Sequence, residues 1–184
     1  MIKLSRGEKP EGLTNDVCEE LKKLYAEDKD RDVWNSSKIK EPLKKAMLEM
    51  SHGKCSYCEC KLGIESKDVT IDHFLPKSEN PDEVVEWENL FPACLRCNRK
   101  KNKREERIVN PCVDEPKEYL GVTSVNRYRL KGIDTQGIGK NTIEVIGLND
   151  IERVMVPRMT EWEALKVHLE EIEEDLKEEG YKNK

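Results

Sequence analysis

Apolar residues near the start of the chain recur at helical spacing, at Leu13, Val17, Leu21 and Leu24. This pattern predicts an amphipathic helix over residues 13–29, with Thr14 or Asn15 as the N-cap. A second helix is predicted over residues 40–50, where Pro42 falls in the first turn and is tolerated. We expect the two helices to brace the segment that follows them.

The pattern changes to alternation in the middle of the chain. Residues 68–73 (DVTIDH) alternate polar and β-branched side chains, which predicts a short strand. We expect a loop over residues 77–93, with a helical turn near residues 83–87. From Cys94, the run ACLRCNRKKNKREER has the composition of a polar helix, which should continue to Asn110-Pro111. The predicted core is therefore a ββα unit.

The C-terminal third carries weaker patterns. Residues 119–122 and 125–133 are interpreted as a short hairpin, and residues 139–148 as a small helix. Residues 150–180 have helical periodicity, in which Pro157 is expected to break or bend the helix.

Composition argues against a large continuous core. The 184 residues are 39% charged and 5% aromatic, and the mean hydropathy is −0.82. A chain of this kind gains stability from a metal staple. No apolar run of about 18 residues is present, and the N-terminus lacks the apolar centre of a signal peptide, so we expect a cytoplasmic protein. In that reducing compartment, cysteines favour metal ligation over disulfides.

Two CxxC pairs are the most specific chemical signal, at Cys55, Cys58, Cys94 and Cys97. Four thiolates in two knuckles form a closed tetrahedral site, which predicts structural zinc. The 35 residues between the knuckles exceed the usual spacing of about 15 to 20, so something folded must lie between them. A redox pair or chance is the alternative reading. Cys60 could replace Cys58 as a ligand, whereas Cys18 and Cys112 are interpreted as ordinary thiols.

An oxygen-rich site is predicted inside this frame. The Asp72 carboxylate and the Asn98 amide oxygen suit Mg²⁺ or Mn²⁺ better than a soft metal. His73 could act as a general base, but neighbours on a flat strand point to opposite faces, so a bend or bulge would be required. His52 and His168 lack such neighbours and are interpreted as incidental.

Charge is distributed unevenly along the chain. The net charge is −5, and residues 161–184 alone hold nine acidic residues against four lysines. Residues 96–107 instead hold seven basic residues against two acidic ones. The candidates for neutralising phosphates on the predicted helix are Arg99, Lys100, Lys101, Lys103 and Arg104. The alternative is a merely solvated helix face. No base-reading motif is present, so sequence specificity cannot be inferred.

These residues together resemble the HNH (ββα-metal) nucleases. The similarity covers about 50 residues and rests on Asp72-His73 in DHFLPKS, Asn89 in ENLFPAC and Asn98 in CLRCNRKK. It implies that His73 is the general base, that Asp72 and Asn98 hold a catalytic metal, and that Asn89 orients the loop and the histidine. The implied reaction is phosphodiester hydrolysis that leaves 5′-phosphate and 3′-hydroxyl ends. DNA is the expected substrate, and RNA remains open.

The outer segments carry a further resemblance. MIKLSR with Pro10 and Leu13, together with TIEVIGLND at residues 142–150, is similar to the PtuB subunits of Septu and related retron-linked antiphage systems. That similarity implies an ATPase partner of the PtuA kind and makes the helical ends docking surfaces. The alternative is that both ends simply cover the core.

The sequence thus predicts an α+β protein in three parts. Residues 1–53 form a helical segment, residues 54–112 a zinc-stapled HNH core, and residues 113–184 a mostly helical region for partner docking. The first hypothesis is a metal-dependent endonuclease that acts in an antiphage complex. The second is a zinc-stapled nucleic-acid or protein adaptor without activity. The joint presence of Asp72, His73 and Asn98 favours the enzyme.

Overall fold

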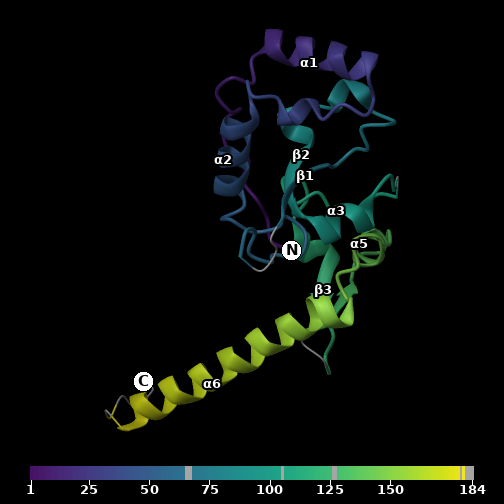
Figure 1. Cartoon of the computed structure of the whole chain (residues 1–184). Coiled ribbons are helices and arrows are strands. Elements are labelled where there is room, and N and C mark those ends of the chain that lie inside the picture. The colour runs from purple at the N-terminus through teal and green to yellow at the C-terminus, as the bar shows by residue number, and fades with distance from the viewer. Residues whose placement is uncertain (65–67, 105, 126–127, 179, 181–184) are drawn as a thin grey trace.

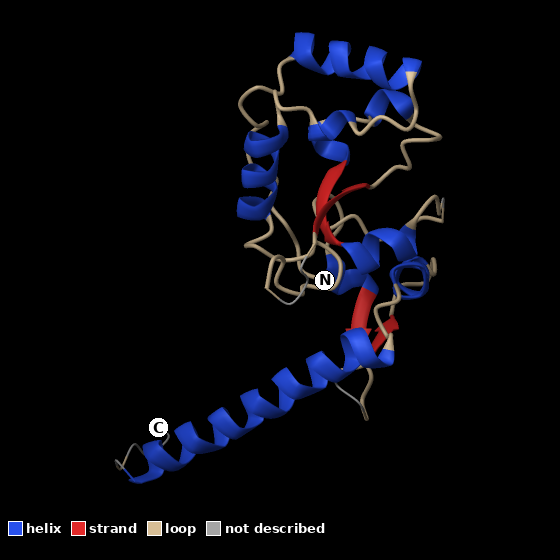
Figure 2. Cartoon of the chain, viewed as in Figure 1, coloured by secondary structure: helices blue, strands red, loops and turns tan. Residues whose placement is uncertain are grey.

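The computed structural model describes residues 1–64, 68–104, 106–125, 128–178 and 180. Its helices and strands, most of them labelled in Figure 1, are α1 (Asn15–Glu27), α2 (Lys40–Met50), β1 (Val69–His73), β2 (Leu90–Cys94), α3 (Leu95–Lys101), α4 (Pro116–Tyr119), β3 (Leu120–Val122), β4 (Leu130–Gly132), α5 (Ile138–Ile146) and α6 (Val156–Glu178). Short 3₁₀ turns cover Val33–Asn35, Pro81–Glu83 and Trp87–Asn89, and a π-helical turn covers Ile151–Met155. The mixture of helices with two small sheets confirms the predicted α+β class (Figure 2).

The two N-terminal helices form where they were predicted. The Thr14 hydroxyl caps α1 by accepting from the Val17 N–H at 3.4 Å. The helix α2 begins at Lys40 and ends at Met50, with Pro42 in its first turn. Both helices bury their apolar faces in one hydrophobic core together with β2 residues Leu90 and Phe91. They therefore support the strand that leads into the second cysteine pair.

The strands β1 and β2 form an antiparallel pair in which Val69 lies opposite Cys94 and His73 opposite Leu90. The predicted strand is confirmed, but the prediction of a loop up to residue 93 is wrong for residues 90–93, the first four of the five buried residues of β2. Pro92 obscured this strand in the sequence. Both strands of a two-stranded sheet are edge strands. Proline is tolerated in an edge strand when the position of its missing N–H faces away from the partner strand.

The helix α3 is shorter than predicted. It ends at Lys101, not near Asn110, because Asn102 adopts a positive φ of 46° that no continuing helix allows. Positive φ is uncommon outside glycine, and asparagine is one of the residue types enriched among the exceptions. The basic run is therefore divided between a helix and the irregular chain after it.

The predicted C-terminal hairpin and small helix are also present, as β3 with β4 and as α5. Residues 126 and 127 of the predicted hairpin lie outside the described residues, as does residue 179 of the predicted last helix. Gly139 permits close packing of α5 on the hairpin region, because a Cβ there would lie 2.0 Å from the Tyr119 carbonyl oxygen. The helix contacts α3 on its other side.

The last helix does not break at Pro157. This residue is the second of α6, directly after the π-helical turn, and a first turn needs no N–H from proline. Arg158 fastens the start of the helix by donating to the carbonyl oxygens of Tyr128, at 2.7 Å, and Leu148, at 3.4 Å. Beyond that point α6 projects away from the rest of the protein (Figure 1). Among the described residues, no helix has both the length and the apolarity to cross a bilayer.

Arg6 ties the N-terminal segment to the centre of the molecule. Its guanidinium donates to the carbonyl oxygens of Glu88 and Leu90, both at 3.1 Å, and to that of Trp87. It also lies over the rings of Trp87 and Phe91, at 4.8 and 4.5 Å from their centroids. The turn that these contacts hold contains Asn89, one of the predicted site residues.

Candidate functional site

Four thiols converge where the two knuckles meet. The ligand atoms of Cys55, Cys58, Cys94 and Cys97 all lie within 4.8 Å of one another, and Cys60 is outside this group. The Sγ atoms of Cys58 and Cys94 are 3.8 Å apart. A tetrahedron with Zn–S bonds of about 2.3 Å has edges of roughly that length. The four predicted cysteines, which we call the thiol cluster, therefore fit a tetrahedral metal ion.

Backbone hydrogen bonds set the positions of these thiols. In the first knuckle, the Cys55 N–H donates to the Cys60 carbonyl at 2.9 Å, and the Ser56 N–H donates to the Pro92 carbonyl at 3.0 Å. The second bond fixes the knuckle against β2. Cys94 is both the last residue of β2 and the N-cap of α3, so that one helical turn brings Cys97 beside it. The cluster thus joins the two segments that flank β1.

The thiols of the cluster affect one another's pKa values and contact a half-buried arginine. Hydrogen bonding with Cys55 lowers the pKa of Cys94 to about 3, whereas hydrogen bonding with Cys58 raises the pKa of Cys55 to about 12. The Arg96 guanidinium donates to the Cys97 sulfur at 3.1 Å and to the Gly147 carbonyl at 3.2 Å. Arg96 therefore supplies positive charge to the cluster and fastens it to the end of α5.

Asp72 lies buried on β1, with partners from two other segments. The Tyr57 hydroxyl of the first knuckle donates to its Oδ2 atom, and the Lys101 Nζ atom lies 3.2 Å from the same oxygen. Lys101 is itself buried and also donates to the His73 carbonyl at 2.6 Å. Burial raises the pKa of Asp72, and the positive charge of Lys101 opposes this shift. The pair thus compensates a carboxylate that would be costly to bury alone.

His73 is a largely buried imidazole. Its Nε2 atom lies 2.8 Å from the Val84 carbonyl oxygen, and its ring meets Trp34 edge-on with centroids 4.7 Å apart. A carbonyl can only accept, so Nε2 carries the proton, and the lone pair of the neutral ring is on Nδ1. Burial lowers the pKa of His73 to about 4, which keeps the ring neutral at physiological pH.

The two asparagines hold the backbone around this pair. The Asn98 side-chain nitrogen donates to Thr70 Oγ1 at 3.0 Å and to the Ile71 carbonyl at 3.2 Å, which fixes the direction of its amide. Asn89 is buried, donates to the carbonyls of Leu75 and Glu83 at 3.1 Å, and accepts from the Leu75 N–H at 2.7 Å. It therefore clasps the loop that carries Val84, the hydrogen-bond partner of His73.

One cavity brings the predicted reactive residues together. Asp72, His73 and Asn98 all line a space of about 510 Å³, which we call the His73 cavity. The β1–β2 register runs without a bulge through Asp72 and His73, so the expected bulge is absent from this pair. The other lining residues are Tyr25, Lys29 and Asp30 near the end of α1, Pro76, Lys77 and Ser78 after β1, and Arg99, Asn102 and Lys103.

The basic residues predicted to bind phosphate have separate surroundings. Arg99 and Lys103 line the His73 cavity, whereas Arg104 lines a different one. Lys100 is exposed, and its side chain lies beside Gly147. The placement of Lys101 differs from the prediction: the residue is 1% exposed and its ammonium is paired with Asp72, so it cannot meet a phosphate at the surface.

Sequence reasoning missed the structural role of two polar residues. Lys101 follows Cys97 and Asn98 by four and three positions, a spacing that places all three on one face of a helix. That spacing was the signal that it is buried. Tyr57 lies between the first two cysteines, and no pattern indicated that its hydroxyl would meet Asp72. The contribution of α1 to the cavity wall also depends on contacts that are distant in sequence.

Comparison with known proteins agrees with this geometry. Residues 55–104 match the family model described as HNH endonuclease, so the chain contains an HNH endonuclease domain. Over 162 residues, or 86% of the chain, it is 41% identical to Septu protein PtuB of Bacillus thuringiensis. Over 142 residues it is 27% identical to Septu protein PtuB of Bacillus mycoides (strain KBAB4), an alignment that covers 59% of the chain. These findings confirm both resemblances seen in the sequence.

The similarity covers only part of those relatives. The chain spans 59% of the length of the first and 47% of the second.

The buried ion pair predicts a large loss of stability when it is broken. Replacing Lys101 by Met leaves Asp72 buried without its cation, which should lower the free energy of unfolding by about 3–5 kcal/mol. The exposed neighbour provides the matched control, Lys100→Met, with a change of less than about 0.5 kcal/mol. Adding Asp72→Asn to Lys101→Met should restore part of the loss. Urea unfolding followed by circular dichroism measures all three, and equal stability of the two single variants would contradict the pairing.

The pKa of His73 predicts a specific acid sensitivity. Its value of about 4 in the folded protein lies below the unfolded value of about 6.5, so the unfolded state takes up the proton first as pH falls. Between pH 7 and pH 4.5, this group should cost about 2–3 kcal/mol of stability. A His73→Gln variant should lose correspondingly less over that range. The exposed residue His52 serves as the control, because His52→Gln should keep the wild-type pH dependence.

Proposed function

We propose that this protein is a metal-dependent endonuclease that hydrolyses phosphodiester bonds of nucleic acid, with DNA as the foremost substrate. The observation that carries the proposal is the shared cavity of Asp72, His73 and Asn98 within the segment that matches the HNH family. Lys29, Lys77, Arg99 and Lys103 line the same space against two acidic residues, Asp30 and Asp72. A cavity with this excess of positive charge suits a phosphate.

His73 acts in this proposal as the general base. The Val84 carbonyl holds the proton on Nε2, which leaves Nδ1 to take a proton from the attacking water. Burial keeps the ring unprotonated, although it also makes the imidazole a weak base. A bound phosphate brings negative charge to the cavity, which favours the protonated ring and strengthens the base when substrate is present.

Asp72 and Asn98 would hold the divalent cation. Their oxygens are the hard ligands that Mg²⁺ and Mn²⁺ prefer, and the hydrogen bonds of the Asn98 nitrogen leave its amide oxygen as the ligand atom. When bound, the ion would stabilise negative charge on the phosphate and on the departing 3′-oxygen. Lys101 already lies on the Asp72 carboxylate, so the ion would share this ligand with the ammonium. Asn89 is a positioning residue, since it holds the loop that orients His73.

Cleavage assays test the nuclease directly. Purified protein should cut plasmid DNA or RNA in Mg²⁺ or Mn²⁺, and His73→Ala should lower the rate by about 10² to 10⁴-fold. His52→Ala, at an exposed histidine outside the cavity, is the matched control and should cleave at the wild-type rate. Equal cleavage by His73→Ala would refute the role of His73. Binding to nucleic acid without cleavage under any of these ions would favour the adaptor hypothesis.

We further propose that the thiol cluster holds structural zinc. Four thiolates leave no open position, so this ion would support the fold without taking part in hydrolysis. The Cys94→Ser variant should lose its zinc, measured by mass spectrometry of the purified protein, and should unfold at lower urea concentration. Cys112→Ser, at a half-buried cysteine outside the cluster, should retain one zinc per chain. Full zinc and wild-type stability in Cys94→Ser would contradict the four-thiolate site.

The two relatives named Septu protein PtuB support a role in antiphage defence. We propose that the protein acts there together with an ATPase of the PtuA kind, as the resemblance of its sequence to PtuB subunits implies. The docking surface we propose for the ATPase is on α6. Five exposed apolar residues recur at alternating spacings of three and four, as in a coiled-coil seam: Trp162, Leu165, Leu169, Ile172 and Leu176. Acidic residues flank this α6 seam, among them Glu161, Glu173 and Asp175. The seam therefore fits a partner helix with basic flanks.

Charge substitutions on α6 test this docking surface. Leu169→Glu places a charge in the middle of the seam and should abolish co-purification with the co-expressed ATPase. Val167→Glu makes the same change at an exposed residue of this helix that lies outside the seam, and it should leave the complex intact. Sedimentation of the isolated chain provides a second readout. The assignment would be contradicted if Leu169→Glu dissociated dimers of this chain but left the complex with the ATPase unchanged. The seam would then join two copies of this chain.

A further inference from the structure

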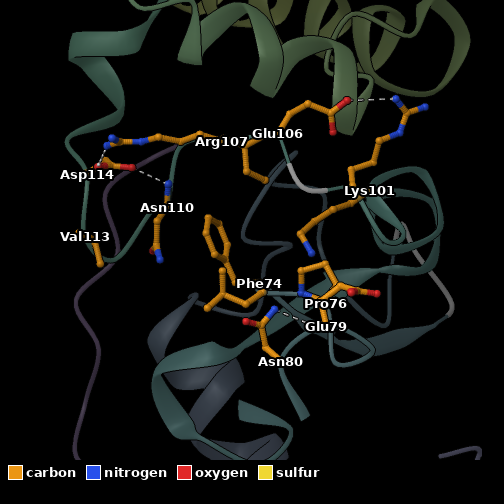
Figure 3. A pocket seen from close by; sticks show the side chains of 13 residues that line it. Phe74, Pro76, Glu79, Asn80, Lys101, Glu106, Arg107, Asn110, Val113 and Asp114 are labelled. Atoms are coloured by element: carbon orange, nitrogen blue, oxygen red, sulfur yellow. Dashed lines mark hydrogen bonds and ion pairs between the residues drawn. The ribbon is translucent and has the colours of Figure 1, made fainter. Parts of the chain in front are cut away.

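A second cavity adjoins the His73 cavity. It has a volume of about 420 Å³, within the roughly 300–1,000 Å³ range of sites for small organic groups. Figure 3 shows its lining, with the Phe74 ring among the labelled side chains. The apolar part of the lining consists of Phe74, Leu75, Pro76, Ile108 and Val113. We call this space the Phe74 cavity.

The two cavities share a wall. Pro76 lines both of them, and Phe74, which lines the second, directly follows His73 of the first. Lys101 lines the Phe74 cavity, while its ammonium meets Asp72 and the His73 carbonyl. Pro76 and the consecutive residues His73 and Phe74 therefore form part of the wall between the two cavities.

The two linings differ in charge. In the Phe74 cavity, the Lys101 ammonium is already paired with Asp72, which leaves Arg104 and Arg107 against Glu79, Glu106 and Asp114. Four of these residues form two rim ion pairs, Arg104 with Glu106 at 3.7 Å and Arg107 with Asp114 at 3.5 Å, and Figure 3 shows the latter. In the His73 cavity the basic residues exceed the acidic ones by four to two. The His73 cavity thus suits an anion, whereas the Phe74 cavity, which has no excess of positive charge, suits an uncharged group.

The same division of charge is found within a nucleotide, whose phosphate is anionic and whose base is flat, aromatic and neutral. An aromatic side chain such as Phe74 provides a surface on which any base can stack. The side-chain amides of Asn80 and Asn110 also line the cavity, and amides can both donate to and accept from the edge of a base.

We propose that the Phe74 cavity receives the base of a nucleotide that is unstacked from its neighbours, next to the phosphodiester in the His73 cavity. This inference rests on the proposed nuclease function. Unstacking a base from a duplex costs a few kcal/mol, whereas a single strand has much less to lose. The cavity therefore selects single-stranded or locally opened nucleic acid over a regular duplex.

Binding measurements can isolate the base from the phosphate. The probes are a fluorescein-labelled single strand of twelve thymidylates and a strand of equal length made of abasic residues. Both are titrated by fluorescence anisotropy against protein that carries His73→Ala, which prevents cleavage. Stacking of a base should make the intact strand bind about tenfold more tightly than the abasic strand. Equal affinity for the two strands would overturn the proposal.

A rim substitution locates the effect. Val113 is 74% exposed, so Val113→Glu should fold normally while it places a charge at the mouth of the cavity. It should remove most of the preference for the intact strand and leave binding of the abasic strand within about twofold. Val125→Glu makes the same change at a residue that is 87% exposed and does not line the cavity, and the preference should persist. A preference that survives Val113→Glu would place the base elsewhere and overturn the assignment.

The nuclease function and this cavity can fail separately. Cleavage of the same strands by the wild-type protein is measured in Mg²⁺ and in Mn²⁺. Cleavage without any base preference would remove only the base cavity. A preference that Val113→Glu abolishes, in a protein that cuts no strand or plasmid, would support the cavity and remove only the nuclease function.

Discussion

The buried charge of Asp72 is the constraint on which the arrangement of this protein depends. A carboxylate in such surroundings is costly unless it is paired, and its partners come from different segments: Tyr57 from the first knuckle and Lys101 from the end of α3. Each of these segments also carries cysteines of the thiol cluster. Two independent interactions, one ionic and one suited to a metal, therefore hold the knuckle, β1 and α3 together.

The surroundings of His73 depend on that frame. Lys101 donates to the His73 carbonyl, so the same ammonium that compensates Asp72 also fixes the backbone at the end of β1. From the other side, Asn89 holds the loop whose Val84 carbonyl fixes the imidazole, and Arg6 holds the turn that contains Asn89. The position of one imidazole is thus determined by contacts with residues far away in sequence. Catalytic geometry generally demands such support.

The segments outside the core differ in how they use their apolar residues. The helices α1 and α2 bury theirs, and the end of α1 also supplies part of the wall of the His73 cavity. The long helix α6 leaves its apolar residues exposed, in a spacing that suits another helix. The N-terminal region is therefore part of the site in this structure, whereas the C-terminal helix contributes no residue to the lining of the His73 cavity.

The sequence alone determined the local chemistry: the two CxxC pairs, the Asp72-His73 pair, and the amphipathic helices predicted over residues 13–29 and 40–50. Each of these is a matter of residue type at short spacing. It did not reveal β2, since Pro92 is unusual in a strand and only pairing with β1 makes it acceptable. Nor did it separate Lys101 from the basic residues around it. Tertiary structure alone decided that this lysine is buried against Asp72 and that Arg99 and Arg104 line different cavities, because burial and ion pairing depend on which distant segments meet.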